Sequence, residues 1–269
     1  MDACKLLALD IDGTLTRPDG SISQYTVSVV KRCLASGIRL CIASGRPPQG
    51  ILPVADLLGM GEYGGYIIAF NGGFLMDYTS GNVLYTSSLP DEALPIAVEC
   101  GRRPGHTILT YTSEEILTEN ASDPYVLVSH TRNGMPVRQV ADFLADVPLP
   151  LPKCIITGDP CDMPALQREV SARLYGIADA YLSDAFFLEI VRKGIDKADA
   201  LGRLLSYLGI THSRLVAAGD GHNDMGMLRL ASVGITMADA HPDVRRVADV
   251  IAPPASEDGL AQVLSALLL

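Results

Sequence analysis

The chain has 269 residues, of which 48% are hydrophobic, and a formal net charge of -10 at pH 7. That length is sufficient for the core of one large domain or of two smaller ones. The acidic balance argues against nucleic acid or an anionic membrane surface as a partner, because both bind clustered Lys and Arg.

Membrane and export signals are also missing from the sequence pattern. The chain has no uninterrupted apolar run of about eighteen residues, and no basic stretch precedes the short apolar run near its start. We therefore expect neither a membrane span nor a signal peptide, and we expect a cytoplasmic location. The six cysteines are scattered without a Cys-x-x-Cys pair, which is typical of free thiols in a reducing compartment.

The first predicted strand ends in two aspartates. Residues 6–9 are apolar, and Asp10 and Asp12 follow at once, with Gly13 and Thr14 behind them. Such a run is typical of a buried strand, so the carboxylates would lie at the carboxyl edge of a parallel sheet, where open α/β folds bind ligands. Close carboxylates favour a hard divalent cation such as Mg²⁺ between them. A turn that merely closes the strand is the simpler alternative.

The next elements complete a βαβ unit. A helix is predicted over residues 23–36, and residues 38–43 return as a strand. This strand ends in Ser44, Gly45 and Arg46. A small hydroxyl and a glycine at a strand edge offer a side-chain donor and a bare backbone amide to a phosphate.

The alternation of strands and helices breaks down in the middle of the chain. Residues 66–70 form a predicted third strand, which leads into Asn71-Gly72-Gly73. Beyond it, strands are predicted over 82–86, 106–111, 125–129 and 154–157, and helices over 89–100, 137–144 and 163–174. This middle segment is therefore of the α+β type.

The regular alternation resumes at about Gly194. Asp196 is predicted to cap a helix that begins with Lys197 and has an apolar face of Ala and Leu. Lys193 competes with Lys197 as a cation for a phosphate, although Lys193 is better placed on a solvated loop.

A second acidic loop follows the predicted strand at residues 215–218. It contains Asp220, Asn223 and Asp224, and therefore repeats the arrangement of carboxylates after a strand. His222 lies in the same loop, where we interpret it as a rim residue and not as an acid or base.

The order of these motifs resembles the four motifs of the haloacid dehalogenase superfamily of phosphohydrolases. They are, in chain order, Asp10-Ile11-Asp12-Gly13-Thr14-Leu15, Ser44-Gly45-Arg46, Lys197, and Gly219-Asp220 with Asn223-Asp224. Asn71-Gly72-Gly73 and Ile195-Asp196-Lys197 are similar to the Cof-type subfamily of sugar-phosphate phosphatases. The resemblance implies an α/β fold with a Rossmann-like core and a parallel sheet, plus an inserted α+β cap domain of type IIB (C2B).

The simplest domain organisation is a discontinuous core with an insertion. We predict a catalytic core of residues 1–84 and 188–269 and a cap domain of residues 85–187, with hinges near 82–88 and 183–189. Because every motif falls in the core, the insertion is expected to supply selectivity and not chemistry.

The resemblance also implies roles for the acidic residues. Asp10 would attack phosphorus as a nucleophile, and Asp12 would protonate the leaving group and then activate water. Mg²⁺ would be held by Asp10, the backbone carbonyl of Asp12, Asp220 and Asp224, the last directly or through water.

The remaining motif residues are predicted to bind the phosphoryl group of the substrate. They are Ser44, Gly45, Arg46, Lys197 and Asn223, and for Arg46 a structural pairing with a core acid is an open alternative.

The expected function is Mg²⁺-dependent hydrolysis of small phosphomonoesters, with sugar phosphates suggested by the resemblance, through an aspartyl-phosphate. Transfer of the phosphoryl group to a sugar hydroxyl is an alternative, since the sequence does not report how well a closed cap excludes water. A non-catalytic sugar-phosphate sensor would lack at least one of the chemical residues, and all are present. The expected partner is a small-molecule phosphoester, with no nucleic acid and no membrane; the oligomeric state is open.

Overall fold

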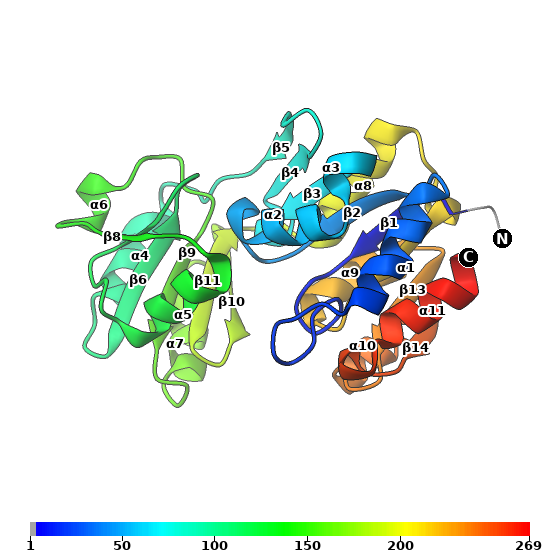
Figure 1. The fold of residues 1–269 in the computed structure, drawn as a ribbon. Helices are drawn as coiled ribbons and strands as arrows, with labels where there is room; N and C mark the ends of the chain where they lie inside the picture. Colours follow the sequence, from blue (N-terminus) through cyan, green and yellow to red (C-terminus); the bar gives the residue numbers. More distant parts are fainter. Residues whose placement is uncertain (1–3) are drawn as a thin grey trace. The chain divides into compact units, whose positions relative to one another are not determined.

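The structure is a computed structural model that describes residues 4–269, and it divides the chain into two compact units (Figure 1). The first unit contains the chain up to Gly45, residues 51–85 and residues 196–269. The second unit contains residues 46–50 and 86–195.

The first unit is built on an eight-stranded sheet in the order β14-β13-β12-β1-β2-β3-β4-β5, counted over the described residues. The strands are β1 (Leu6–Leu9), β2 (Arg39–Ala43), β3 (Tyr66–Ala69), β4 (Phe74–Asp77), β5 (Val83–Thr86), β12 (Leu215–Ala218), β13 (Val233–Met237) and β14 (Val250–Ala252). The strands from β14 to β3 are parallel, and β4 is antiparallel to β3. The carboxyl ends of β12, β1 and β2 therefore meet at one edge of the sheet.

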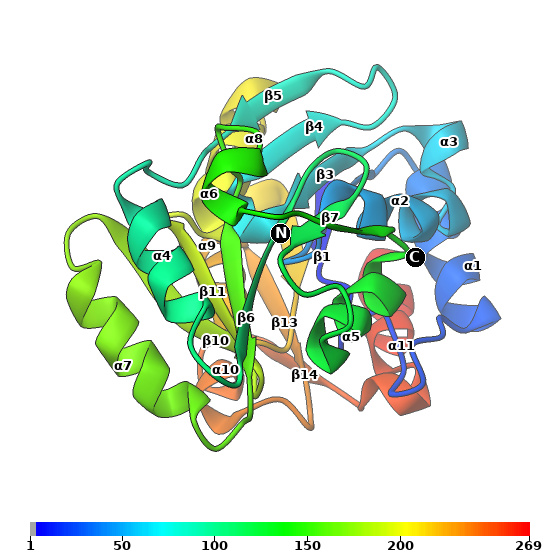
Figure 2. The same ribbon diagram turned by 90° about the vertical axis from the view of Figure 1, so that its left-hand side faces the viewer.

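Helices cover both faces of this sheet. Figures 1 and 2 show α8 (Lys197–Leu208) and α9 (Met225–Leu230) on one face, and α1 (Gln24–Ala35) and α11 (Gly259–Leu268) on the other. Because both faces are covered, every residue of the central strand β1 is apolar and fully buried. The other helices are α2 (Pro48–Leu57), which begins in the second unit and continues in the first, α3 (Met60–Tyr63) and α10 (Pro242–Arg245).

Short 3₁₀ turns follow several strands of the first unit. They are η1 (Phe70–Gly72), η2 (His212–Arg214), η3 (His222–Asp224) and η4 (Ala255–Glu257). The turn η1 directly follows β3, and η3 follows β12 after a short loop, so both place polar residues at the carboxyl edge of the sheet.

The second unit has its own six-stranded sheet, in the order β10-β11-β9-β6-β7-β8 within the described residues. The strands are β6 (His106–Tyr111), β7 (Ile116–Thr118), β8 (Val137–Gln139), β9 (Cys154–Gly158), β10 (Ala178–Asp184) and β11 (Phe187–Arg192). All pairs are antiparallel except β7 with β8. The helices are α4 (Ala93–Gly101), α5 (Pro124–Asn133), α6 (Phe143–Asp146) and α7 (Met163–Arg173).

Strand alternation divides the side chains of this second sheet between its two faces. Ile108 and Ile156 belong to the apolar core that the sheet forms with α4 and α7. Their neighbours Thr107 and Thr157 point the other way, where both hydroxyls donate to Asp123, the residue that caps α5. The helix α5 therefore packs on the face opposite to α4 and α7, as Figure 2 also shows.

Two of the predicted elements in this unit were wrong. Residues 125–129 were predicted as a strand, but they lie in α5, because the Asp123 side chain accepts hydrogen bonds from the N–H groups of Tyr125 and Val126 and Pro124 opens the first turn. Residues 137–144 were predicted as a helix, but they form β8 and only the start of α6, since Asp142 caps a helix that begins at Phe143. In both cases a local cap outweighed the apolar pattern.

The division into units differs from the predicted domain boundaries in two places. Residues 46–50 belong to the second unit, although they were predicted to lie in the core. The crossing between Tyr85 and Thr86 lies within the predicted hinge at 82–88, whereas the crossing between Ile195 and Asp196 was predicted at 183–189. Residues 188–195 follow the second unit because β11 pairs with both β9 and β10.

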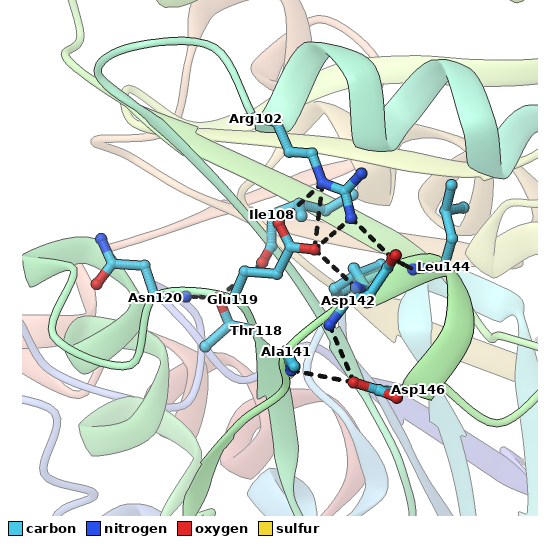
Figure 3. Close-up of polar contacts among 10 residues, drawn as sticks. Arg102, Ile108, Thr118, Glu119, Asn120, Ala141, Asp142, Leu144 and Asp146 are labelled. Atoms are coloured by element: carbon cyan, nitrogen blue, oxygen red, sulfur yellow. Dashed lines mark hydrogen bonds and ion pairs between the residues drawn. The ribbon is translucent and has the colours of Figure 1, made fainter.

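A network of charged residues joins three elements at the surface of the second unit (Figure 3). Arg102 is the residue directly after α4. Its guanidinium donates to both carboxylate oxygens of Glu119, at 3.2 and 3.0 Å, and to Asp142 at 2.8 Å. The Glu119 carboxylate also accepts the N–H of Phe143, and Asp142 accepts the N–H of Leu144. One guanidinium thus orders both acidic groups at the start of α6.

A buried ion pair lies on the α5 face of the second sheet. Lys153 Nζ donates to Glu189 Oε2 at 2.9 Å, and the two side chains are only 2% and 7% exposed. The Tyr181 hydroxyl donates to the same oxygen at 3.2 Å. Neither charge has ready access to water, so each depends on the other for compensation.

Replacement of one partner of this pair is therefore expected to be more harmful than replacement of both. Lys153→Met should lower the free energy of unfolding by about 3 to 5 kcal/mol, because it leaves Glu189 charged and buried. The double variant Lys153→Met/Glu189→Leu should recover most of this loss. Urea unfolding followed by circular dichroism measures both values, and a double variant no more stable than the single one would contradict the explanation.

Candidate active site

Asp10 stands at the centre of the carboxyl edge of the first sheet. It follows β1, its N–H donates to the carbonyl of Ala218 on β12 at 3.0 Å, and it is only 6% exposed. Gly13 has a φ of +79°, and a Cβ there would lie 2.3 Å from Oδ2 of Asp220. Glycine is thus needed at this turn both for its backbone conformation and for the close approach of a second carboxylate.

Lys197 joins the two acidic loops. Its Nζ donates to Asp10 Oδ1 and to Asp224 Oδ1, both at 2.6 Å, and its side chain is fully buried. Asp196 caps α8 by accepting the N–H of Asp199 at 2.7 Å, so the helix begins at Lys197, as predicted from the sequence. An ammonium group is thereby held between two carboxylates from opposite ends of the chain, Asp10 and Asp224.

The loop after β12 is shaped around the carboxylate of Asp224. Its Oδ2 accepts the N–H groups of Asp220 at 3.1 Å and Gly221 at 2.9 Å. A Cβ on Gly219 would lie 2.4 Å from the Asp224 side chain, so only glycine allows this fold of the loop. The Thr14 hydroxyl donates to Asp220 Oδ1 at 2.9 Å and ties this loop to the one after β1.

A second part of the site comes from β2 and β3. Ser44 is buried, its N–H donates to Ile68 at 2.9 Å, and its carbonyl accepts the N–H of Asn71 at 3.0 Å. A Cβ on Gly45 would lie 3.0 Å from the Asn71 amide. The Asn223 amide donates to Asn71 Oδ1 at 2.8 Å. Asn71 therefore links the Ser44 and Asn223 loops.

Asn71 was missed as a site residue in the sequence analysis. Asn71-Gly72-Gly73 indicated the Cof-type subfamily, but no contact with the substrate or with another site residue was predicted for Asn71. Its left-handed conformation, with a φ of +54°, is unusual for a residue other than glycine and is consistent with a strand-end turn that presents its amide. Thr14 orders the acidic loop through its hydrogen bond to Asp220.

Burial and repulsion from Asp224 raise the pKa values of Asp10 and Asp220. For Asp10, burial and then the charge of Asp224 hold the pKa well above its ordinary value, although the Lys197 ammonium acts in the opposite direction. For Asp220, burial and the Asp224 charge raise the pKa to about 6. Burial by itself would lower the pKa of Lys197, but the two carboxylates outweigh it and raise the pKa above its usual range, so this side chain stays charged.

The donor set fits a hard divalent cation. Carboxylate oxygens of Asp10, Asp220 and Asp224 lie within 4.8 Å of one another. When ionised, these groups carry three negative charges against the single positive charge of Lys197, and oxygen ligands of this kind suit Mg²⁺. The Asp12 carboxylate is outside this group and is exposed.

The two remaining basic residues that the sequence pointed to lie in the second unit. Arg46 donates to the carbonyls of Gly50 at 3.2 Å and Arg132 at 3.5 Å. Lys193 is exposed, and its Nζ lies 5.4 Å from the ring centroid of Tyr175. Of the two candidate lysines, Lys197 is buried and contacts Asp10 and Asp224, whereas Lys193 is exposed.

None of the helices within residues 4–269 combines the length and the apolar character that a bilayer crossing requires.

Comparisons with known proteins show the family of this chain. A family model described as haloacid dehalogenase-like hydrolase matches residues 7–264. The chain is 27% identical over 265 residues to a 5-amino-6-(5-phospho-D-ribitylamino)uracil phosphatase of Bacillus subtilis, with 96% of each chain covered. It is 28% identical over 244 residues to an HMP-PP phosphatase of Yersinia pseudotuberculosis, with 90% of this chain and 86% of the relative covered.

The fold is likewise similar to solved structures. A crystal structure of a haloacid dehalogenase-like hydrolase from Bacteroides thetaiotaomicron superposes with a TM-score of 0.94 at 41% identity, and covers 98% of this chain and 99% of that one. The predicted resemblance and the predicted class, an α/β fold with a parallel sheet and a cap domain, are confirmed.

The raised pKa of Asp220 predicts how the stability of the metal-free protein depends on pH. The folded state binds the proton of Asp220 more tightly than the unfolded state does, because its pKa is raised. The free energy of unfolding therefore falls as the pH rises from the ordinary pKa of 3.8 to about 6, and it stays lower above pH 6. Asp220→Asn keeps an acceptor for Thr14 and should raise the free energy of unfolding at about pH 7.5 more than at about pH 4. Denaturation in chelator measures this difference. Exposed Asp91→Asn is the control, and equal gains at both pH values would contradict the assignment.

Proposed function

Because the chain belongs to the haloacid dehalogenase-like hydrolases, of the Cof type, we propose that it hydrolyses small phosphomonoesters with Mg²⁺ and an aspartyl-phosphate intermediate on Asp10. The family and the named relatives make the protein a phosphatase; the metal, the substrate and the role of each residue are the proposal. The observation that supports it best is the buried cluster in which Lys197 bridges Asp10 and Asp224 at 2.6 Å each.

Asp10 is the proposed nucleophile. One of its oxygens forms a bond to phosphorus as the bond from phosphorus to the leaving oxygen breaks. The carboxylate must be ionised to attack, and the Lys197 ammonium stabilises the ionised form against the effect of burial. Water then attacks the phosphorus, the bond to Asp10 breaks, and inorganic phosphate leaves with the carboxylate restored.

Asp12 is the proposed acid and base. Its side chain is exposed, so it can exchange protons with solvent between the two half-reactions. In the first it gives a proton to the leaving oxygen, and in the second it takes one from the attacking water. This division of labour requires Asp10 and Asp12 to have different surroundings, and one is buried while the other is exposed.

Charge neutralisation is the other requirement of the reaction. A bound Mg²⁺, held by Asp10, Asp220, Asp224 and the Asp12 carbonyl, would supply a Lewis acid for the phosphoryl oxygens. An ammonium has three N–H donors, and two of those on Lys197 are directed at Asp10 and Asp224. We propose that the third donates to a phosphoryl oxygen of the substrate.

The proposed phosphate contacts of the first unit are the Ser44 hydroxyl, the Gly45 amide and the Asn223 side chain, in addition to Lys197. Asn71 orients two of them, since it contacts both the Ser44 backbone and the Asn223 amide. Arg46 is retained as a proposed substrate contact, and it belongs to the second unit. The other predicted site residues all fall in the first unit. We therefore propose the second unit as the source of selectivity.

Sugar phosphates are the substrate class that we propose, on the resemblance to the Cof type. One relative is named for a substrate in which a phosphorylated ribityl chain is joined to a uracil ring. A panel of hexose phosphates, pentitol phosphates and pyrimidine-linked phosphates, assayed for released phosphate, ranks these possibilities. Transfer to a sugar hydroxyl would appear in the same assay as a new phosphorylated product.

The roles of the two aspartates predict different kinetics. Asp10→Asn should abolish turnover and formation of the acyl phosphate, because an amide is a poor nucleophile. Asp12→Asn should retain trapping of the phosphoenzyme with esters whose leaving groups have low pKa values, because these need no general acid. Chelator should abolish wild-type activity, and added Mg²⁺ should restore it. Identical dependence of both variants on leaving-group pKa, or full activity in excess chelator, would contradict the proposed roles.

Lys197 is expected to matter equally for every substrate. Lys197→Met removes the shared ammonium while keeping an unbranched side chain. It should lower kcat/KM for all phosphoesters alike, by a factor that corresponds to a loss of about 2 to 4 kcal/mol of transition-state stabilisation. Lys193→Met is the matched control, since this exposed lysine lies four positions earlier, and it should leave kcat/KM unchanged. Circular dichroism checks that the Lys197 variant folds. A changed order of substrate preference would assign selectivity to Lys197 and contradict the proposal.

A further inference from the structure

A second group of metal-ligating side chains lies outside the acidic cluster. One nitrogen from each of His222 and His241 and one carboxylate oxygen of Asp243 lie within 4.8 Å of one another. All three side chains are accessible to solvent, with exposures of 62%, 54% and 44%. The group shares no residue with Asp10, Asp220 and Asp224.

The fold brings these residues together from two neighbouring strands. His222 opens η3, which follows β12, and His241 caps α10, which follows β13. The strands β12 and β13 are adjacent and parallel, and α10 packs against η3. The two imidazole rings therefore lie side by side, with centroids 4.6 Å apart.

The spacing of the donor atoms suits a tetrahedral ion. Asp243 Oδ2 lies 3.5 Å from His241 Nδ1 and 3.8 Å from His222 Nε2. A zinc ion with ligand bonds of about 2.0 to 2.1 Å requires its ligands to be about 3.4 Å apart in tetrahedral geometry. One nitrogen of each imidazole lies within 4.8 Å of the other, so movement of the exposed side chains toward one another would complete the arrangement.

The surroundings of Asp243 orient it toward the histidines. Arg246 donates to Oδ1 of Asp243 and leaves Oδ2 on the side of the two rings. A partner of this kind fixes the direction of a ligating carboxylate. One existing hydrogen bond competes with metal binding. The N–H of Asp243 donates to His241 Nδ1 at 3.2 Å, and therefore occupies a nitrogen that an ion would need. An ion would replace this single capping bond at the start of a helix of four residues.

We propose that His222, His241 and Asp243 form a surface site for Zn²⁺ or a similar borderline transition ion, which ties the loop after β12 to α10. Two imidazoles and one carboxylate are ligands that such ions prefer, whereas the all-oxygen cluster around Asp10 suits Mg²⁺. Water completes the coordination, because the exposed side of the group is open to solvent. The proposal is independent of the proposed phosphatase mechanism.

Cobalt(II) is a suitable probe, since its visible absorption distinguishes nitrogen-containing tetrahedral sites from octahedral oxygen sites. We titrate the full chain with Co²⁺ in excess Mg²⁺ and expect one tetrahedral ion for each chain, displaced by Zn²⁺. Zn²⁺ should also raise the Tm in excess Mg²⁺, because it binds the folded state. Asp10→Asn, which disrupts the acidic cluster from the loop after β1, should retain the cobalt spectrum.

His241→Ala and Asp243→Asn should each weaken Co²⁺ binding by about tenfold or more and remove the Zn²⁺-dependent rise in Tm. Both lie outside the acidic loops, and His212→Ala, which removes another exposed histidine, is the matched control. Circular dichroism verifies that each variant folds. The proposal is overturned if wild type gives no tetrahedral spectrum, if His241→Ala binds as wild type does, or if Asp10→Asn abolishes the spectrum.

Discussion

The contact of the Lys197 ammonium with Asp10 and Asp224 is the constraint on which the rest of the active site depends. All three groups are buried, so none is well solvated, and each would destabilise the fold without the others. The contact joins the end of β1, the start of α8 and the loop after β12. These three segments must therefore adopt one common arrangement, which gives the site its fixed geometry.

The same cluster holds more negative charge than the protein itself neutralises. Gly13 and Gly219 permit this, because any larger residue at either position would collide with a carboxylate of the site. The backbone N–H groups of Asp220 and Gly221 stabilise only one oxygen of Asp224. Burial and then the remaining repulsion raise the pKa values of Asp10 and Asp220, and a divalent cation would relieve the repulsion. The proposed cation would therefore offset a repulsion that the folded state itself creates.

Donor chemistry separates two kinds of site along one edge of the sheet. The acidic cluster offers oxygen alone, whereas His222 and His241 add nitrogen. Hard cations prefer oxygen donors, whereas borderline transition ions also bind nitrogen. The two groups are therefore suited to different ions, even though His222 is only two residues from Asp220 and from Asp224 in the chain. The second unit is built differently, on a mostly antiparallel sheet with its own apolar core and a buried pair of Lys153 and Glu189.

Much of the first unit could be predicted from local sequence. Short apolar runs followed by Asp10, Ser44 or Asp220 predict strands that end in polar loops, and Asp196 before Lys197 predicts a helix start, because these signals act over a few residues. Tertiary packing decided what local patterns do not contain. It buried Lys197 and left Lys193 exposed, paired Asn71 with Asn223, and brought His241 beside His222. It also joined residues 188–195 to the second unit through the pairing of β11. Each of these outcomes depends on contacts between segments distant in the chain, whose energies no local pattern of residues encodes.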